Sequence, residues 1–433
     1  MADATQSAPM QSAPVQTGPM LAADGTPLKQ SLARSLRNQK IRALALIAPL
    51  LLFVLLSFVI PIGQMLFKSV ENDIVADTLP LTVAALQDWD AASGELPDEP
   101  VYEAFVTDMI EAVAAKQHTR LGTRLNYEET GMSSLFRKSG RQIRRIDIAE
   151  DAPFKEKLID INEDWGDVET WSVIKTHSVR MTNGYFLNAV DMKRTPEGAQ
   201  SQPEDRQILV KLFIRTLIMS LAITGSCILL GFPIAWIIAN QPARIGNLLL
   251  ILVLLPFWTS LLVRTSAWIV MLQQQGVVNE ILVWLNVIAD DARLVMIRNE
   301  VGTIVAMTHI LLPFMILPMY SVMQTINPSY LRAAKSLGAT NFTAFWRVYF
   351  PLTVPGIGAG SILVFILAIG YYITPEIVGG TSGIFISNRI AFHISSSLNW
   401  GLAAALASIL LAAVLILYWA YDKIVGIDNV KLG

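Results

Sequence analysis

The hydrophobic and polar positions divide the chain into long apolar stretches separated by polar segments. A helix rises about 1.5 Å per residue, so about 20 apolar residues cross the roughly 30 Å hydrocarbon core of a bilayer. Six stretches reach this length, and we interpret each one as a membrane-spanning helix. They run approximately over residues 42–66, 208–238, 246–271, 301–324, 353–375 and 400–421. The pattern predicts an all-α polytopic membrane protein with six transmembrane helices.

The N-terminal region divides into a polar tail and a first span. Residues 1–40 begin with a stretch rich in Ala, Gln, Pro, Thr and Ser, and we expect them to form a disordered cytoplasmic tail. Residues 41–68 form the first transmembrane helix, which has no charge between Arg42 and Phe67. This stretch is too long for a signal-peptide core, so we interpret it as an uncleaved anchor.

Residues 69–206 form a long polar insertion between the first and second spans. Residues 101–116 place apolar side chains at helical spacing, with acidic residues on the other face. Residues 171–179 and 181–190 resemble strands, with Asn183-Gly184 as a turn between them. We therefore expect a small mixed α/β domain, followed over residues 207–428 by a five-helix core.

Composition supports a membrane protein and excludes several soluble classes. Of the 433 residues, 53% are hydrophobic and only 16% are charged, and the mean hydropathy is +0.47. These values exclude an ordinary cytosolic globular protein, a disordered chain and a nucleic-acid-binding protein. The single cysteine, Cys227, excludes an internal disulfide and a cysteine-rich metal site. We expect no metal site in this chain.

The charges are distributed unevenly, and their distribution predicts the orientation. Residues 71–205 hold 26 acidic and 14 basic residues, whereas the rest of the chain holds 9 acidic and 19 basic residues. Lys and Arg favour the cytoplasmic side of membrane spans. With both termini inside, the cytoplasmic segments contain 11 basic residues against four acidic ones. We therefore predict cytoplasmic termini and an insertion on the outside, which in a bacterium is the periplasm.

The inside loop between the fourth and fifth spans has the pattern of two short helices. Asn327 is a suitable cap and Pro328 suits the first helical position. Gly338 suits a left-handed turn after the first helix, and Thr340 suits the cap of a second helix that we expect Pro351 to end. An aromatic and basic helix pair of this kind suits docking onto another protein. The alternative is an amphipathic segment that lies on anionic lipid headgroups.

This loop resembles the EAA loop of ABC-importer permeases. The resemblance rests on Arg332, Ala333, Ala334, Leu337, Gly338, Ala339, Phe345, Pro351 and Pro355-Gly356, with Arg332 in place of the usual leading Glu. Residues 256–268 and 276–280, and residues 370–380, resemble the spermidine/putrescine (polyamine-type) branch of these permeases. The resemblance covers about residues 40–68 and 207–428, and it does not explain the insertion.

The resemblance implies a type I importer permease that couples transport to ATP hydrolysis in a separate subunit. Loop 327–351 would then be the coupling loop. The implied partners are a dimer of ATPase subunits, a second homologous permease and a periplasmic solute-binding protein, together with membrane lipid. The chain has no Gly-x-x-x-x-Gly-Lys-Ser/Thr loop, so ATP and Mg²⁺ would be bound by the partner ATPase and no cofactor by this chain. The implied cargo is a polyamine or a related small amine or amino-acid derivative, carried across the bacterial inner membrane.

Several residues within or beside the spans are candidates for the transport pathway. Arg264 lies in an apolar stretch, where a charge costs about 2.5–3.5 kcal/mol at a helix centre and usually marks a pathway or an ion pair. The alternative is an arginine that reaches towards the outer interface. His309 is more typical of a hydrogen-bond donor between helices than of a ligand. The remaining candidates are Trp258, Trp268, Tyr371, Tyr372 and Glu376, for which an aromatic belt or a solvated carboxylate is the alternative.

Two other classes of function stay open at this stage. A secondary transporter normally has carboxylates within its spans and internal repeats, and these spans contain almost no Asp or Glu away from their ends. A membrane-anchored periplasmic sensor or enzyme would use the insertion, but we find no nucleophile arrangement or metal-ligand spacing there. The sequence therefore favours the importer permease.

Overall fold

The computed structural model describes residues 28–146, 148 and 152–425. The chain separates into two compact units, residues 1–64 and residues 65–433. The expected disordered tail falls partly outside the described residues, since residues 1–27 are among those not described. Residues 28–40 are helical and begin α1 (Leu28–Val54). No Gly or Pro interrupts residues 28–48, so nothing in this sequence breaks the helix that leads into the membrane.

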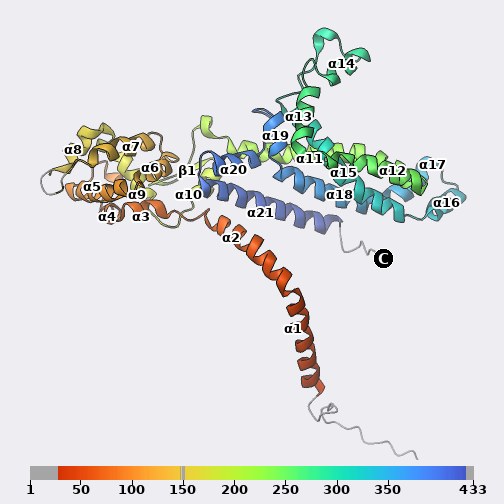
Figure 1. The fold of residues 1–433 in the computed structure, drawn as a ribbon, viewed down its shortest axis with the longest axis horizontal. Coiled ribbons are helices and arrows are strands. Elements are labelled where there is room, and N and C mark those ends of the chain that lie inside the picture. The colour runs from red at the N-terminus through yellow and green to blue at the C-terminus, as the bar shows by residue number, and fades with distance from the viewer. Residues whose placement is uncertain (1–27, 147, 149–151, 426–433) are drawn as a thin grey trace, which may run out of the picture. The chain divides into compact units, whose positions relative to one another are not determined.

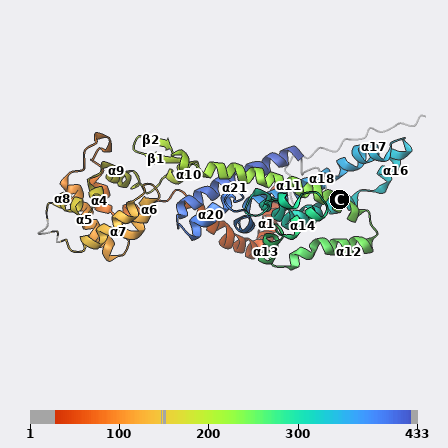
Figure 2. The same cartoon turned by 90° about the horizontal axis from the view of Figure 1, so that it is seen from above.

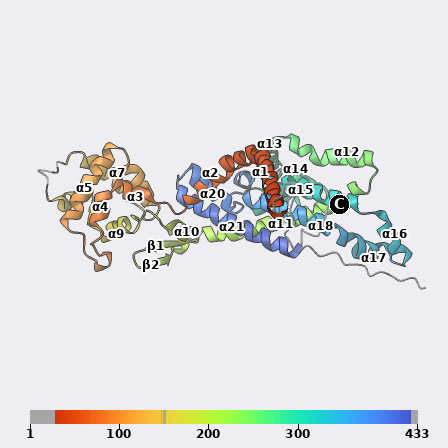
Figure 3. The same ribbon diagram turned by 90° about the horizontal axis from the view of Figure 1, so that it is seen from below.

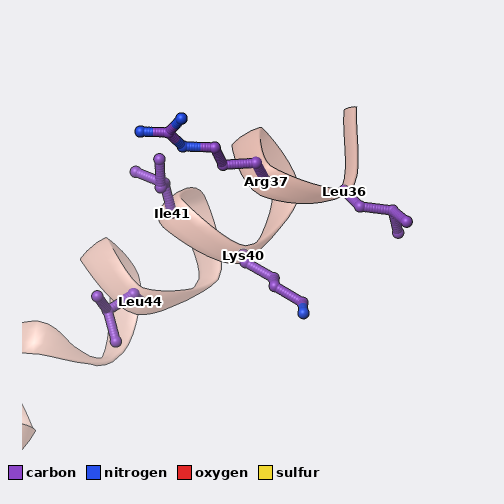
Figure 4. A pocket seen from close by; sticks show the side chains of 5 residues that line it. All are labelled: Leu36, Arg37, Lys40, Ile41 and Leu44. Carbon is purple, nitrogen blue, oxygen red and sulfur yellow. The ribbon is translucent and has the colours of Figure 1, made fainter. Parts of the chain in front are cut away.

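The first candidate span continues from α1 through a π-helical turn, η1 (Leu55–Val59), into α2 (Ile60–Phe67). Its apolar part covers residues 36–67. Figure 4 shows Arg37 and Lys40 beside Leu36, Ile41 and Leu44, all from α1, which form an open groove on one helix. The two cations therefore lie at the beginning of the apolar stretch, where the positive-inside pattern expects them.

Three long helices form the centre of the second unit. Figures 1 and 2 show α11 (Leu209–Ala239), α15 (Glu300–Thr325) and α18 (Phe350–Gly370) side by side, and α21 (Trp400–Val425) also contacts α18. The helices approach closely at small residues, as is common in membranes. A Cβ atom at Gly360 would lie 2.7 Å from the sulfur and 3.1 Å from the backbone oxygen of Met315, so a larger residue there would force α15 and its methionine to shift.

The third predicted span is not one straight helix. It consists of α12 (Ala243–Leu254), a 3-10 turn η5 (Leu255–Trp258) and α13 (Leu261–Met271), with a bend of 94°. Pro256 has no backbone N–H, and Thr259 and Ser260 are extended, so the helical hydrogen bonds end there. The described residues thus contain five helices long enough to span, or six spans if the bent pair counts as one.

Shorter elements lie between the long helices. Between α13 and α15 they are α14 (Val277–Trp284) and the 3-10 turn η6 (Asp290–Ala292). Between α15 and α18 they are α16 (Pro328–Ser336), α17 (Asn341–Ala344) and the π-helical turn η7 (Phe345–Tyr349). Between α18 and α21 they are α19 (Ile373–Val378) and α20 (Ile386–Ser395).

The insertion is a cluster of short helices, as Figure 3 shows, and its core is rich in aromatic side chains. Trp165 lies at its centre, and its indole N–H donates to Ser139 Oγ at 2.8 Å. Its backbone oxygen accepts hydrogen bonds from Tyr102 and Trp171, each at 3.0 Å. The indole N–H groups of Trp165 and Trp171 and the hydroxyl of Tyr102 are therefore paired while the rings are buried. The helices are α3 (Asp73–Thr78), α4 (Pro80–Ala85), α5 (Glu99–Ala114), α6 (His118–Asn126), α7 (Met132–Ile143), α8 (Phe154–Ile161), α9 (Val168–Thr176) and α10 (Gly184–Ala189), with 3-10 turns η2 (Ala91–Ser93), η3 (Glu163–Gly166) and η4 (Glu204–Arg206).

The helix expected over residues 101–116 is present as α5, but the two expected strands are wrong. Residues 171–179 lie largely in α9, and residues 181–190 contain α10. Trp171 and Ile174 are three residues apart, so a helix buries both in the aromatic core, and the Asp167 side chain caps its first turn. The observed strands, β1 (Met192–Thr195) and β2 (Gly198–Ser201), form one antiparallel hairpin with Met192 opposite Ser201.

Direct contacts join the insertion to the membrane helices of the second unit. The Asp191 carboxylate accepts hydrogen bonds from the backbone N–H groups of Leu209 and Val210, at 3.0 and 2.9 Å, and so caps α11. A Cβ atom at Gly401 would lie 2.3 Å from the ring of Tyr185, so any larger residue at the start of α21 would displace this ring. The ends of α11 and α21 are thus fixed by the insertion.

The insertion also contains a buried network of charged and polar side chains. Arg124 donates to Glu128 at 2.7 Å and to the Asn72 side chain at 3.0 Å, and Glu128 also accepts from Asn188 at 3.1 Å. Burial alone would raise the pKa of Glu128, but Arg124 and the hydrogen bonds outweigh burial and hold this pKa below its usual value. Burial lowers the pKa of His177, 3.9 Å from Glu128, to about 4. His177 is therefore neutral in the folded insertion at neutral pH.

We predict that the insertion loses stability as the pH falls from 6.5 towards 4. The unfolded chain protonates His177 near its ordinary pKa of 6.5, whereas the folded chain resists protonation down to about 4, so acid favours unfolding. Full protonation of His177 corresponds to a loss of about 3 kcal/mol in the free energy of unfolding. Thermal unfolding of the purified chain, followed by tryptophan fluorescence at pH values across this interval, measures the effect. His177→Leu is the control, and an equal pH dependence in both proteins would contradict the prediction.

Candidate functional site

The loop between α15 and α18 folds into the two helices that its sequence indicates. The Asn327 side chain accepts a hydrogen bond from the Ser329 N–H at 2.9 Å, and Pro328 occupies the first turn of α16. The Thr340 hydroxyl accepts from the Thr343 N–H at 3.2 Å and caps α17. Between the helices Gly338 has a φ of +88°, a conformation that favours glycine. Gly338 therefore allows the chain to turn between α16 and α17.

This loop presents apolar and basic side chains outward. The exposed fractions of Leu337, Phe342 and Tyr330 are 90%, 74% and 55%. Arg332 and Ala333 are also exposed, whereas Ala334 and Ala339 are partly buried. Figures 1 and 2 place α16 and α17 beyond one end of the long helices. Large exposed apolar side chains with cations beside them form a surface suited to a protein partner.

Aromatic rings attach the loop to the helical core. The Phe345 ring stacks on Tyr349 with centroids 5.8 Å apart, and it also meets Phe232 of α11 at 6.1 Å. Tyr349 is buried, with 4% of its surface exposed. Phe345 thus faces the bundle, so it supports the loop from inside and does not belong to its outer surface.

Pro351 does not end the second helix, contrary to the sequence prediction. Residues 341–370 form one continuous helical span that includes Pro351 in the first turn of α18. The π-helical turn η7 precedes it, and the Phe350 N–H bonds to Phe345 O, five residues back. This wider turn makes room for a proline ring that would otherwise clash with the carbonyl four residues back. The loop is therefore continuous with a membrane span.

Three of the candidate pathway residues lie on the bent third span. Trp258 lies in η5 with 78% of its surface exposed. On α13, the partly buried Arg264 guanidinium lies 6.0 Å from the Phe257 ring centroid. The Trp268 indole N–H donates to His309 Nδ1 of α15 at 3.1 Å. The hydrogen bond between helices that the sequence predicts for His309 is present, but His309 accepts this bond instead of donating it. The bond attaches α13 to α15.

The other candidates lie around α19. The backbone oxygens of Tyr371 and Tyr372 accept hydrogen bonds from Ser387 and Asn388 of α20, at 2.6 and 2.9 Å. Asn388 also donates to the Glu376 carboxylate at 2.5 Å. Sequence reasoning missed Asn388, because an isolated asparagine beside a short helix has no distinguishing pattern.

A hydroxyl contact joins these two groups of residues. Thr265 of α13 and Thr374 of α19 are both buried, with their hydroxyl oxygens 3.4 Å apart. The structure thus brings the α13 and α19 candidates to adjoining surfaces, while Trp258 stays on the exposed bend. Among the residues that the structure describes, no group of three or more His, Cys, Asp or Glu side chains is placed to hold a metal ion.

The helical membrane core, the broken span and the outward helix pair define a membrane-transport subunit. Residues 228–425 match the family described as "Binding-protein-dependent transport system inner membrane component". The chain is 35% identical over 219 residues to the spermidine/putrescine transport system permease protein PotB of Salmonella typhimurium strain LT2, covering 50% of this chain and 76% of that protein. It is 34% identical to PotB of Escherichia coli K12, covering 50% of this chain and 79% of that protein.

The chain therefore belongs to the family of inner-membrane permease subunits of binding-protein-dependent ABC importers, and it is related to PotB. Such a subunit carries no cofactor, and ATP is hydrolysed by a partner subunit. A crystal structure of a bacterial ABC transporter involved in the import of alginate matches at 19% identity with a TM-score of 0.40, covering 51% of this chain and 80% of that one.

We predict that His309→Leu lowers the free energy of unfolding by about 1 kcal/mol, because the Trp268 N–H loses its acceptor within the membrane. His309→Gln provides an amide oxygen and is expected to lose less. Unfolding in mixed micelles at increasing dodecyl sulfate concentration gives both values. Two variants as stable as the wild type would show that this bond does not hold α13 against α15.

Proposed function

We propose that this permease moves spermidine, putrescine or related small amines from the periplasm into the cytoplasm. The observation that carries the proposal is the 35% identity to PotB, whose name states spermidine/putrescine transport. The exposed Glu376 carboxylate with Tyr372 nearby adds support. Ammonium groups bind carboxylates and the faces of aromatic rings, so these side chains suit a cationic amine at the outer entrance.

We propose that Arg264, Trp258 and Trp268 line the pathway beyond that entrance. Non-helical backbone within a membrane is tolerated where it is buried in protein or lines an aqueous cavity, and the bend at Thr259–Ser260 is such a segment. The exposed Trp258 and Ser260 fit a cavity wall. Arg264 repels a cation, so its proposed role is to shape the wall, with its charge close to Phe257.

We propose that α16 and α17 form the coupling loop that docks into the ATPase subunit. The exposed Leu337 and Phe342 supply an apolar contact, and Arg332 presents a cation where the family usually has Glu. The contact residues would include Ala333, Ala334, Gly338 and Ala339, with Phe345 and Pro351 joining the loop to α18. ATP-driven movement of the ATPase would thereby reach the membrane helices.

The proposed assembly is a type I importer with six spans in this subunit and both termini in the cytoplasm. The basic residues on the inside segments support this orientation. A dimer of ATPase subunits would bind the inner loops, a second homologous permease would complete the pathway, and the solute-binding protein would dock outside. The acidic insertion would then lie in the periplasm.

We predict that Glu376→Gln weakens the apparent affinity for spermidine about tenfold, because one charge-assisted hydrogen bond to an ammonium group is lost. Glu376→Asp keeps the charge and is expected to retain most of the affinity. ATP-dependent uptake of labelled spermidine into proteoliposomes that contain the importer and its binding protein, with putrescine as competitor, measures both variants. Wild-type importer that takes up neither amine would refute the proposed substrate class.

We predict that Gly338→Val lowers uptake about tenfold while ATP hydrolysis continues. The φ of +88° costs a β-branched residue about 1–2 kcal/mol, so the loop seldom adopts its docking shape. A Cβ atom at this position meets nothing within 4 Å, so the strain lies in the backbone alone. Gly338→Asn is the matched control, since asparagine tolerates this region. Equal ratios of uptake to hydrolysis in both variants would contradict the prediction.

A further inference from the structure

Arg264 is a charged side chain within an apolar membrane segment, and the described residues give it no counter-charge. Its guanidinium forms no ion pair or hydrogen bond with any residue that the structure describes, and its Nε is buried without an acceptor. The centroid of the Phe257 ring lies 6.0 Å from the guanidinium carbon, at the limit of a cation–π contact. Charges in membrane segments are costly and usually pair with another group. Arg264 therefore needs an anionic partner from outside the described part of the chain.

His309 is a second hydrogen-bond donor without an acceptor. The Trp268 indole N–H donates to His309 Nδ1 at 3.1 Å, so Nδ1 carries no proton. The neutral imidazole then has its proton on Nε2, and this N–H is free to donate. Within residues 28–146, 148 and 152–425 no acceptor bonds to it. His309 and Arg264 together thus offer one neutral and one charged donor.

These two donors lie close together where α13 meets α15 and α19. Arg264 and Trp268 are four residues apart on α13, so their side chains are neighbours on one face of this helix. Trp268 in turn is bonded to His309 of α15. Arg264 is also near enough to His309 and Tyr371 to act electrostatically on both. A group that accepts hydrogen bonds and carries negative charge would satisfy both donors at once.

A small hydrated ion can approach this place from the bend in the third span. The Arg264 backbone N–H bonds to Ser260 O at 3.1 Å, so Arg264 lies one helical turn beyond the bend. Thr259 and Ser260 have exposed side chains and extended backbone. Non-helical backbone in a membrane is tolerated where it is buried in protein or lines an aqueous cavity. The exposed bend therefore gives a polar route to Arg264.

We propose that Arg264 and His309 bind a small monovalent anion, such as chloride or acetate, between α13 and α15. A cation would be repelled by the guanidinium, and a neutral ligand would leave its charge unbalanced. The anion accepts charge-assisted hydrogen bonds from Arg264 and one further bond from His309 Nε2. Because binding is argued from these donors alone, it does not depend on the identity of the cargo. A consequence that does rest on the proposed function is that the bound anion cancels the charge of Arg264 towards an ammonium cargo.

The position of His309 favours a free ion over the phosphate of a lipid headgroup. His309 belongs to α15, which packs along both α11 and α18 and is thus the central helix of the bundle. The His309 and Arg264 side chains are both partly buried. A lipid phosphate would have to enter between helices to reach both donors, whereas a free ion needs only the polar route at the bend.

Equilibrium dialysis of the intact purified importer with labelled chloride tests the proposal. We expect saturable chloride binding by the wild type, displaced by acetate and weakened at least tenfold in Arg264→Gln. Arg264→Lys keeps the charge and is expected to retain most of the binding. Arg215→Gln is the matched control, because Arg215 already donates to Thr381 O at 3.1 Å and lies 3.9 Å from Glu300. Wild-type importer without saturable binding, as expected if lipid or another chain supplies the counter-charge, would overturn the proposal. Equal binding by Arg264→Gln would overturn it as well.

Thermal unfolding gives a second measurement that does not depend on a radioactive label. At constant ionic strength, replacing isethionate, a bulkier anion, with chloride is expected to raise the unfolding temperature of the wild type and of Arg215→Gln, because chloride binds the folded state. Arg264→Gln is expected to unfold at the same temperature in both salts. A chloride effect of equal size in Arg264→Gln would contradict the anion site. Amine uptake is measured separately: an importer that binds chloride but takes up no amine refutes only the proposed function, and one that takes up amines without binding chloride refutes only the anion site.

Discussion

A chain that crosses hydrocarbon has to satisfy its backbone N–H and C=O groups without water, and this constraint determines the membrane part of the structure. Two prolines, Pro61 and Pro351, are kept inside spans by a π-helical turn that comes before each of them. Pro61 follows the π-helical turn η1, and Pro351 follows η7. In each case the residue before the proline bonds to a carbonyl five residues back, so the helix widens before the ring and continues. The third predicted span, by contrast, is interrupted at Thr259–Ser260, beside the proposed pathway.

The insertion obeys a different constraint, because water competes for its polar groups and an apolar core has to be buried within the insertion itself. Its aromatic rings surround Trp165, and each buried polar tip of that cluster has a partner. The connection to the membrane helices uses close contacts, with the Asp191 carboxylate on the first N–H groups of α11 and the Tyr185 ring against Gly401. These contacts lie at the starts of α11 and α21. The insertion therefore fixes where two spans begin on its side of the membrane.

The sequence predicts the structure best where a local rule acts alone. Asn327, Gly338 and Thr340 are capping and turn residues, and each has the backbone role that its type indicates. The same local rules fail where distant contacts decide. Residues 171–179 read as a strand, but packing of Trp171 in the aromatic core makes them helical. Pro351 reads as a helix end because a preceding π-turn has no sequence signature. The link between Asn388 and Glu376 joins α20 to α19, so neither local segment reveals it.

The continuity across Pro351 changes how the two ends of the subunit are related. Residues 341–370 form a single helix of 30 residues, about 45 Å long at 1.5 Å per residue. One end begins at the Thr340 cap, within the proposed coupling loop, and the other end leads into Tyr371 and Tyr372. A break at Pro351 would allow the loop to move while the outer residues stayed in place. Because the helix is continuous and α18 packs along α15, a shift of α17 is transmitted to α18 through the π-helical turn η7. This one continuous helix thus connects the proposed coupling loop directly to the residues of the proposed outer entrance.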